Sequence, residues 1–390
     1  MEEKNNHQDR FDWTLAFLIF LLFVFSLVAI YSGQTQAKVP DNYVLQQTVW
    51  YLVGAGIIAF ALLLEPDQYK KLAWVFYIFG VLLLVALHFA PAKIAPETRG
   101  AKSWFVIPKV GSIQPSEFMK VFLILGLSRL ISDHNEKYAV RKTLQSDFWL
   151  LVKIGLVAVV PLGFIMMQSD MGTAMVITAI TIGMILVSGI SWKILVPTFS
   201  AIALFVGAVV GIIVYFPEWI EGIIPPYQTS RIYAWLDPYN YARGSGYQLI
   251  TSLQAIGSGG ISGKGFMAKE VYVADRHTDF IFSVIAEEFG FIGASALISI
   301  FFLLIYHIIK IALETNSPFN SYICAGIISM ITFQVFQNIG MSIQLLPITG
   351  IPLPFISYGG SSMMGTMMAM GLVFSIKFYH KKYMFSSDDE

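Results

Sequence analysis

Ten long apolar stretches divide this chain, and they constrain its fold more than any other feature. About 20 apolar residues form a helix long enough to cross the hydrocarbon core of a bilayer. With 56% hydrophobic and only 13% charged residues, the 390-residue chain has too few polar residues to cover a soluble fold. The predicted spans are residues 13–31, 44–64, 72–90, 116–132, 148–168, 172–191, 194–216, 280–309, 321–344 and 362–378. We therefore predict an all-α, polytopic membrane protein with about ten transmembrane helices.

The positions of Lys and Arg predict which side each loop faces. An even number of spans places both termini on one side of the membrane. If that side is the cytoplasm, 13 of the 25 basic residues lie there, and the positive-inside rule supports this orientation. The first span is longer than the apolar core of a signal peptide, so we expect it to be retained. Both termini are therefore predicted to be cytoplasmic.

Two segments predicted to lie outside are unexpectedly basic. A long loop can be translocated despite its charge, and for residues 217–279 that explanation remains open. It is weaker for residues 91–120. The alternative is that both segments bind an anionic group at the level of the outer headgroups. Their basic residues are Lys93, Arg99, Lys102, Lys109, Lys120, Arg231, Arg243, Lys264, Lys269 and Arg276.

Charge and cysteine content exclude several classes of function. The formal net charge is zero, so no global field favours nucleic acid or another polyanion. Cys324 is the only cysteine in the sequence, which excludes an internal disulfide and a metal site built from thiolates. We predict that the chain does not bind nucleic acid.

The long loop contains a helical pattern followed by a glycine-rich segment. Apolar residues within 246–256 recur at helical spacing, as in a helix that lies in the membrane interface. The glycines after it do not form a nucleotide site. A Walker A motif would need Gly at position 258, where Ser258 stands, and Ser or Thr at position 265, where Gly265 stands. A dinucleotide fingerprint would need Gly at position 262, where Ser262 stands. We predict no nucleotide cofactor, but a flexible loop whose backbone can approach a phosphate.

The stretch "GAKSWFVIPKVGSIQPSEFMK" leads into the fourth span. Pro115 marks the start of its helix, and Glu117 and Lys120 are three residues apart, so they share a helix face and can pair. A charged pair at membrane depth is either functional or a structural contact between helices. Trp104 is either part of a site or an interfacial anchor.

Aspartates stand at the start of two other spans. In "MQSDMGTAM", Asp170 is expected to cap the following helix, and its outward position also makes it a candidate site residue. In "ADRHTDFIFSVIAEEFGFIG", His277 and Asp279 lie at the outer mouth of the eighth span. A carboxylate there can be partly desolvated and still reach a substrate, as a general base requires. The alternative for Asp279 is a helix N-cap.

Two further features bear on the site. Of the two glutamates in this span, Glu287 is the one expected to share a side of the helix with Asp279, because a helix places these two residues about 80° apart. Glu288 would lie about 180° from Asp279. A buried contact between helices would explain either glutamate equally well. Three prolines forbid a regular helix over 345–362, so this segment is expected to shape a cavity.

Together these motifs resemble the SEDS family of bacterial membrane proteins (shape, elongation, division and sporulation). The similarity covers nearly the whole chain and rests on "GAKSWF" with "IQPSEFMK", "HTDFIF" followed by "AEE", the loop from "GYQ" through "GSGG" to "GKG", and "PFISYGGSS". The chain looks most like the elongation member through "IAPETRGAKSWF" and "QPSEFMKV", although the division and sporulation members share the core motifs. The resemblance implies a single transmembrane domain over 1–390, with a large extracytoplasmic loop at 217–279.

The resemblance also implies an activity. It implies a peptidoglycan glycosyltransferase of the bacterial cell membrane, with an outward-facing site that polymerises lipid II, expels undecaprenyl pyrophosphate and inverts the donor sugar. Asp279 corresponds to the family's catalytic residue. The substrate-binding candidates are Trp104, Glu117, Lys120, Arg99, Lys102, Asp170, Arg231, Lys264 and His277. Met171 replaces the family's usual Leu in "QSDMG", which leaves the role of Asp170 open.

Partners and alternatives follow from the same resemblance. A divalent cation, Mg or Mn, could assist departure of the pyrophosphate, and a class B penicillin-binding protein is the expected transpeptidase partner. A lipid II flippase is one alternative, with Glu117, Lys120, Glu287 and Glu288 along its path. A scaffold that only recruits a synthase is another.

Overall fold

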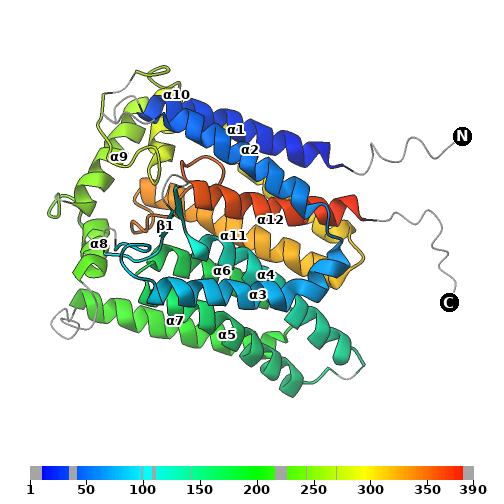
Figure 1. The fold of residues 1–390 in the computed structure, drawn as a ribbon. Helices are drawn as coiled ribbons and strands as arrows, with labels where there is room; N and C mark the ends of the chain where they lie inside the picture. The colour runs from blue at the N-terminus through cyan, green and yellow to red at the C-terminus, as the bar shows by residue number, and fades with distance from the viewer. Residues whose placement is uncertain are drawn as a thin grey trace, which may run out of the picture.

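The computed structural model describes residues 11–34, 42–97, 100–107, 111–140, 142–215, 226–242, 244–268 and 270–380. Within these ranges, ten long helices form one bundle (Figure 1). All ten coincide with predicted spans. They are α1 (Trp13–Gln34), α2 (Tyr43–Ala61), α3 (Pro66–Phe89), α4 (Pro115–Lys137), α5 (Leu144–Met167), α6 (Met171–Val187), α7 (Trp192–Tyr215), α10 (Ile281–Glu314), α11 (Pro318–Ser342) and α12 (Gly360–Phe378).

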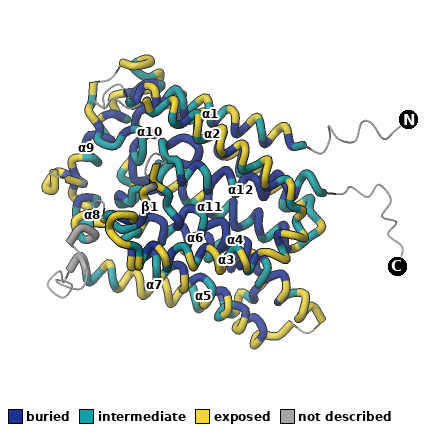
Figure 2. The backbone as a smooth tube through the Cα atoms, in the orientation of Figure 1, coloured by how far each residue is buried: buried dark blue, intermediate teal, exposed yellow. Residues whose placement is uncertain are grey.

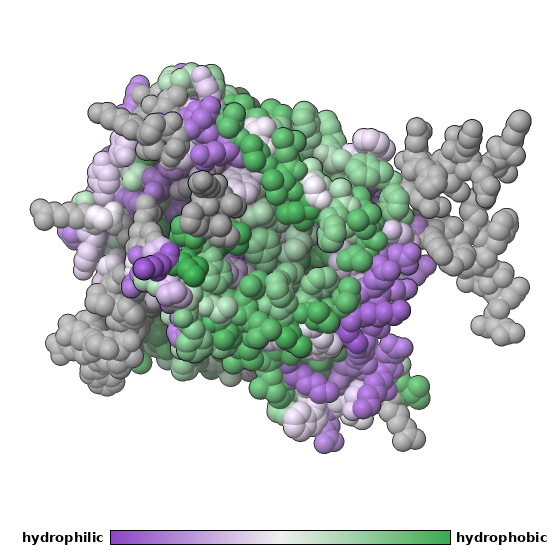
Figure 3. Space-filling view, in the orientation of Figure 1, coloured by the Kyte–Doolittle hydropathy of each residue, from purple (hydrophilic) through white to green (hydrophobic). Residues whose placement is uncertain are grey.

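The exterior of the bundle is that of a membrane protein. Eight of the long helices can cross a membrane by length and composition alone; α6 is shorter, at 17 residues, and α4 is long enough but more polar. Large apolar side chains such as Leu204 and Phe302 are exposed. In the view of Figure 3, hydrophobic residues cover the middle of the helices and hydrophilic residues gather toward the ends. This distribution matches a bundle surrounded by lipid.

The first and last helices meet at one end of the bundle (Figure 1). The Phe11 ring stacks on Phe374 with a centroid distance of 5.3 Å, and Asp12 Oδ2 lies 2.7 Å from Nε2 of His307 near the end of α10. We call this the terminal end. The opposite end is the loop end. The start of α1 and the end of α12 therefore lie at the same end of the bundle, as an even number of spans predicts.

The centre of the bundle consists of α4, α11 and α12, which are buried along most of their length (Figure 2). α4 packs on α3, α11 and α12, and α12 also packs on α2. By contrast, α7 packs on α5 at the edge of the bundle and is largely exposed. Polar side chains on the central helices are thus held inside the molecule.

Smaller elements cover the loop end. Strands β1 (Phe105–Ile107) and β2 (Gly111–Ile113) form an antiparallel hairpin just before α4. The long loop contains α8 (Pro226–Leu236), which the sequence did not predict, and α9 (Ser245–Gly259), which confirms the predicted helix at 246–256. α9 packs on α10 and α11, and Ser252 Oγ donates a hydrogen bond to the carbonyl of Ser342 (2.9 Å).

The helical backbone of α10 is interrupted at Gly290 (φ 61°, ψ −157°). The glycine segment after α9 supplies the missing hydrogen bonds. Backbone N–H groups of Lys264 and Gly265 donate to the carbonyls of Glu287 (3.1 Å) and Glu288 (3.0 Å). On the other side of the break, the N–H groups of Phe291 and Ile292 donate to the carbonyls of Gly260 (2.9 Å) and Ile261 (3.2 Å).

This arrangement corrects one expectation. The glycine loop was expected to be flexible and to approach a phosphate, but its backbone is engaged with α10. A Cβ at Gly263 would clash with the Glu288 carbonyl, and one at Gly290 would clash with the Gly263 backbone. The glycines are needed because two backbones meet here.

Candidate active site

A cavity of about 1080 Å³ brings together segments that are far apart in the sequence. Its walls come from α2, the hairpin, the first turns of α4, α6 and α12, α8, α11 and the segment 349–352. Segment 345–362 thus helps to form the cavity. Six predicted site residues line it: Trp104, Glu117, Lys120, Asp170, Arg231 and Asp279.

The backbone before α10 fixes the position of Asp279. The carbonyls of His277, Thr278 and Asp279 each accept a hydrogen bond from another part of the chain. Their donors are the backbone N–H of Tyr358 (3.0 Å), Ser357 Oγ (2.7 Å) and Asn338 Nδ2 (2.7 Å). Because these donors lie on α11 and on the segment before α12, the tertiary fold holds the aspartate in place.

The Asp279 side chain is half-buried at the cavity wall. It is not an N-cap: α10 begins at Ile281, and the N-cap position belongs to Phe280. A Cβ at Gly350 would lie 3.3 Å from Asp279 Oδ2, so the carboxylate lies against a backbone without a side chain. Gly350 has φ +74°, a conformation that favours glycine. Asp279 is therefore partly desolvated and still reachable from the cavity.

Glu117 and Lys120 form the predicted ion pair on the first turns of α4, with Nζ 2.7 Å from Oε2. Both side chains are almost fully buried and line the cavity. An ammonium group has three hydrogens to donate. Among the residues that the structure describes, Glu117 is the hydrogen-bond partner of Lys120. Its remaining donors are available to an anionic group in the cavity.

Asp170 has the capping role that the sequence favoured. Its Oδ1 accepts a hydrogen bond from the Thr173 backbone N–H (3.0 Å), and its Oδ2 accepts from Gln114 Nε2 (2.7 Å) and Ser116 Oγ (3.4 Å). The carboxylate thereby joins the start of α6 to the start of α4. It also lines the cavity, so capping and proximity to the site coexist.

Arg231 and Trp104 reach the cavity from the loop end. Nη1 of Arg231, on α8, lies 3.5 Å from the carbonyl of Thr349, next to the glycine that supports the Asp279 carboxylate. Trp104 is half-buried at the start of the hairpin. It lines the cavity, so membrane anchoring does not account for its position on its own.

Other predicted site residues lie elsewhere. Lys102 Nζ donates to the carbonyls of His88 (2.9 Å) and Ala90 (2.5 Å) at the end of α3. Lys264 pairs with Glu270 (2.6 Å). The His277 ring stacks on Tyr43 at 4.7 Å, so it faces α2. None of these three side chains lines the cavity. Arg99 lies outside the residues that the structure describes.

Fewer basic residues therefore line the cavity than the sequence predicted. Six of the ten outer basic residues lie in the described ranges, and of these Lys120 and Arg231 line the cavity. Lys93 is exposed to solvent, and Arg276 is buried in an ion pair. A binding site for an anion at this end thus has two cations from the described part of the chain.

Glu287 corrects another expectation, because it does not share the cavity with Asp279. Its carboxylate is fully buried, 2.6 Å from Nη2 of Arg276. It also accepts from the backbone N–H groups of Glu270 (3.1 Å) and Val271 (3.2 Å). Glu288 accepts a hydrogen bond from Ser32 of α1. Both glutamates therefore join elements within the protein, the alternative that the sequence left open.

Three amides on α11 were missed. Gln334 is buried and lines the cavity, and within the described chain its Oε1 has no hydrogen-bond partner. Gln337 donates to Pro347 (3.0 Å), and Asn338 donates to Asp279 and to Ile351 (2.8 Å). The sequence did carry a signal, since three amides within one helical turn of an apolar span are unusual.

The described residues do not build a metal site. Among them, no three His, Cys, Asp or Glu side chains are close enough to hold an ion. In the cavity, Glu117 is paired with Lys120, and the Asp170 oxygens accept hydrogen bonds. A protein-held divalent cation does not fit this arrangement, and no step below passes through one.

Comparisons with known proteins agree with this architecture. The model of the FtsW/RodA/SpoVE family, described as a cell cycle protein, matches residues 9–382. A Bacillus subtilis (strain 168) relative named probable peptidoglycan glycosyltransferase FtsW is 37% identical over 386 residues, covering 95% of this chain and 91% of that protein.

Two solved structures also superpose on almost the whole chain. One is a chain of a peptidoglycan synthase complex that coordinates polymerization and crosslinking (TM-score 0.77, 27% identity, 95% of this chain and 99% of that chain). The other is the rod shape determining protein RodA of Thermus thermophilus (TM-score 0.67, 26% identity, 95% and 98%). The chain therefore belongs to the FtsW/RodA/SpoVE family, the SEDS family that its motifs resemble.

Proposed function

We propose that the chain is a peptidoglycan glycosyltransferase that polymerises lipid II into glycan strands. One observation carries the proposal: the half-buried carboxylate of Asp279, fixed through its backbone, faces a cavity that also contains Lys120 and Arg231. A general base beside cations suits the transfer of a sugar from a diphosphate. The 37% identical relative bears the glycosyltransferase name, which supports the same activity.

In the proposed reaction, the 4-hydroxyl of the acceptor GlcNAc attacks the anomeric carbon of the donor MurNAc. A new carbon–oxygen bond forms as the bond to the diphosphate breaks, and the configuration inverts from α to β. Asp279 takes the proton of the attacking hydroxyl. The diphosphate leaves with both electrons of the broken bond. Lys120 and Arg231 stabilise the negative charge that develops on it.

The other cavity residues orient these groups. Glu117 holds the Lys120 ammonium, and Asp170 fixes the first turn of α6 against α4. Trp104 offers an aromatic face to a sugar or lipid. A divalent cation, Mg²⁺ or Mn²⁺, stays a prediction, and polymerisation with and without a chelator tests it.

The loop end is proposed to face outward. The chain is a multi-pass protein of the bacterial cell membrane, and positive charge in its sequence favours cytoplasmic termini. The loop end, opposite the termini, would then meet lipid II in the outer leaflet. A class B penicillin-binding protein is the proposed partner, in keeping with the coordinated crosslinking described for the similar synthase complex.

The cellular role is proposed to be elongation and maintenance of rod shape. The motifs around Trp104 and Glu117, together with the similarity to RodA, support it. The 37% identity to an FtsW-named relative keeps the division role as the alternative. Complementation of cells lacking either function distinguishes the two roles.

A lipid II flippase is the main alternative activity. Its path would use Glu117, Lys120, Glu287 and Glu288. Glu287 and Glu288 are instead bonded to neighbouring parts of the protein. The charges that remain in the cavity lie near the loop end, which favours chemistry there over passage through the membrane.

Purified protein supplied with lipid II tests the proposal. We expect glycan strands from wild type and from Asp237→Asn, a control for an exposed loop-end acid, but none from Asp279→Ala. Normal polymerisation by Asp279→Ala would remove Asp279 from this role. Lipid II movement across vesicles without polymer would support the flippase, and rescue of cell shape by the inactive variant would support the scaffold.

A further inference from the structure

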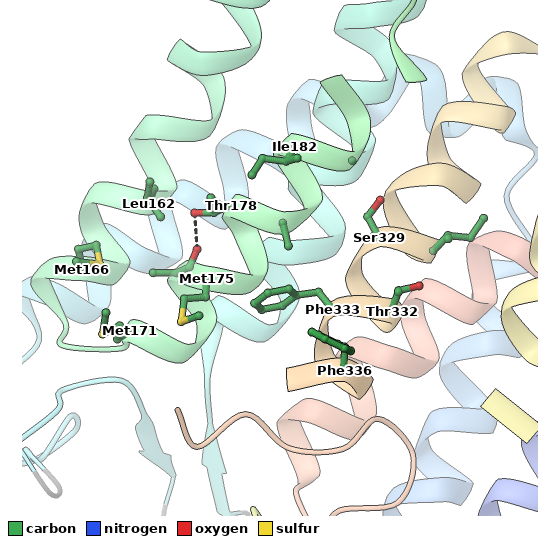
Figure 4. A pocket seen from close by; sticks show the side chains of 14 residues that line it. Leu162, Met166, Met171, Met175, Thr178, Ile182, Ser329, Thr332, Phe333 and Phe336 are labelled. Carbon is green, nitrogen blue, oxygen red and sulfur yellow. Dashed lines mark hydrogen bonds between the residues drawn. The ribbon is translucent and has the colours of Figure 1, made fainter. Parts of the chain in front are cut away.

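A second hollow lies between α5, α6 and α11 and has a volume of about 760 Å³ (Figure 4). We call it the apolar groove. Most of its lining is hydrocarbon or thioether. The hydroxyls of Thr178 and Ser329 are engaged within their own helices, with the carbonyls of Ala174 (2.9 Å) and Ala325 (2.8 Å). The groove therefore offers little to a polar ligand and much surface to an apolar one.

The groove is lined by small residues such as Gly183 and Ser329 and by larger ones such as Met175 and Phe333. A Cβ at Gly183 would clash with the Ser329 side chain, so α6 and α11 touch there. Figure 4 places Met175 on α6 opposite Phe333 and Phe336 on α11. Methionines and aromatic rings adapt to an irregular, methyl-branched chain better than a rigid aliphatic surface does.

The groove and the active-site cavity share one lining residue, at the first turn of α6. Met171 lines both, whereas its neighbours Asp170 and Gly172 line only the cavity. From Met171 the groove follows α6 as far as Ile182 and Gly183. At 1.5 Å per residue this is roughly 18 Å, a little over half the thickness of a hydrocarbon core. One molecule could thus place its polar head in the cavity and its tail in the groove.

We propose that the apolar groove binds the polyisoprenoid chain of the lipid-linked sugar, with the diphosphate held in the adjoining cavity. This inference rests on the proposed function, which supplies a substrate with both a diphosphate head and a long apolar tail. The shared residue Met171 favours this occupant over a bilayer phospholipid, because Met171 also lines the cavity that contains Lys120 and Arg231.

Binding of the tail would position the diphosphate of the substrate. With the chain seated along α6, the diphosphate is held at the cavity end of the groove, where it can meet the two cations. A substrate with a short chain would lose this contact but keep the polar ones. The groove should therefore affect the KM of long-chain substrates selectively.

Thr178→Phe tests the proposal by filling the groove. KM is measured for lipid II analogues with an undecaprenyl or a geranyl chain, and each is compared with its own wild-type value. We expect the undecaprenyl KM to rise about tenfold or more and the geranyl KM to stay nearly constant. Ser299→Phe on α10 is the matched control, because Ser299 is also exposed and bonded to its own helix (2.8 Å to Ser295). It should change neither value.

A labelling experiment on wild type provides a second test that needs no substitution. Undecaprenyl diphosphate with a photoreactive group in its tail is expected to label α6 and α11 peptides. Excess unlabelled undecaprenyl diphosphate should displace it, whereas phosphatidylglycerol vesicles should not.

Several outcomes would overturn the groove assignment. In the kinetic experiment, these are equal KM changes for the undecaprenyl and geranyl substrates, or loss of the transpeptidase partner from Thr178→Phe while KM is unchanged. In the labelling experiment, it is equal displacement of the label by phospholipid. If wild type makes no polymer while selective labelling persists, the proposed function fails and the groove assignment stands. If wild type polymerises but labelling is not selective, only the groove assignment fails.

Discussion

Asp279 and Glu287 lie eight residues apart around the start of α10, yet their surroundings differ. Asp279 is fixed through its backbone, and its half-buried carboxylate faces the cavity. Glu287 is fully buried, and its carboxylate binds Arg276 and two backbone N–H groups. The first region positions a reactive group, whereas the second region joins a loop to a helix.

The difference shows how one helix serves both structure and chemistry. A buried carboxylate whose oxygens are all engaged has little freedom to accept another proton or ligand. Around Asp279, the main-chain carbonyls of three consecutive residues accept hydrogen bonds from other parts of the chain, and the side chain lines the cavity. This distinction predicts which substitutions alter stability and which alter activity.

Glu287→Leu is expected to have the largest effect on stability. It leaves Arg276 charged in a buried site and removes the acceptor of two backbone N–H groups. Breaking a buried pair in this way costs about 3–5 kcal/mol. Thermal unfolding in detergent micelles should show a marked fall in Tm. Asp279→Asn is the control and should keep the wild-type Tm while abolishing polymerisation; equal loss of Tm in both variants would contradict the comparison.

Gly290→Ala should have the next largest effect, because it disturbs the junction that carries Glu287 and Glu288. Alanine is strained at φ 61°, and its Cβ would clash with the Gly263 backbone. Together these effects should cost about 2–3 kcal/mol. Gly257→Ala in α9 is the matched control, since a Cβ there meets nothing within 4 Å and alanine favours a helix. A similar Tm change in both variants would show that the junction is not strained by a side chain.

The length of the apolar stretches predicted the ten spans because a membrane helix is apolar whether it faces lipid or packs against its neighbours. It did not predict the break in α10, since Gly290 lies between Phe289 and Phe291 and interrupts no apolar pattern. The motifs identified six residues of the cavity. The contacts that fix Asp279 were missed because Asn338 reaches it across 59 positions of sequence, and no local pattern records such a pairing.

Asn338→Leu should weaken the placement of Asp279. The substitution leaves the carbonyls of Asp279 and Ile351 without this donor, a loss of about 1–2 kcal/mol at a buried site. We expect kcat for polymerisation to fall roughly tenfold with KM nearly constant, since a change of 1.4 kcal/mol corresponds to a tenfold change in rate.

Gln337→Leu is the control for this prediction. Gln337 also donates to a loop carbonyl, that of Pro347 (3.0 Å), but not to the segment of Asp279. Equal losses of kcat in the two variants would mean that the whole loop, and not the placement of Asp279, limits the reaction.

Asp12 is a third acid for comparison and has the smallest expected effect. It lies directly before α1, at the terminal end of the bundle, and contacts His307 of α10. Burial raises the pKa of its carboxyl, but hydrogen bonds with His307 and the Leu15 N–H and the charges of His307 and Lys377 outweigh burial and lower the pKa below its ordinary value. A lowered folded-state pKa stabilises the protein above the unfolded pKa of about 4, and this stabilisation disappears as the pH falls through the folded value. The Tm difference between wild type and Asp12→Asn should therefore be largest near neutral pH and shrink below about pH 4. A difference that stays constant over this range would show that Asp12 acts through packing and not through its charge.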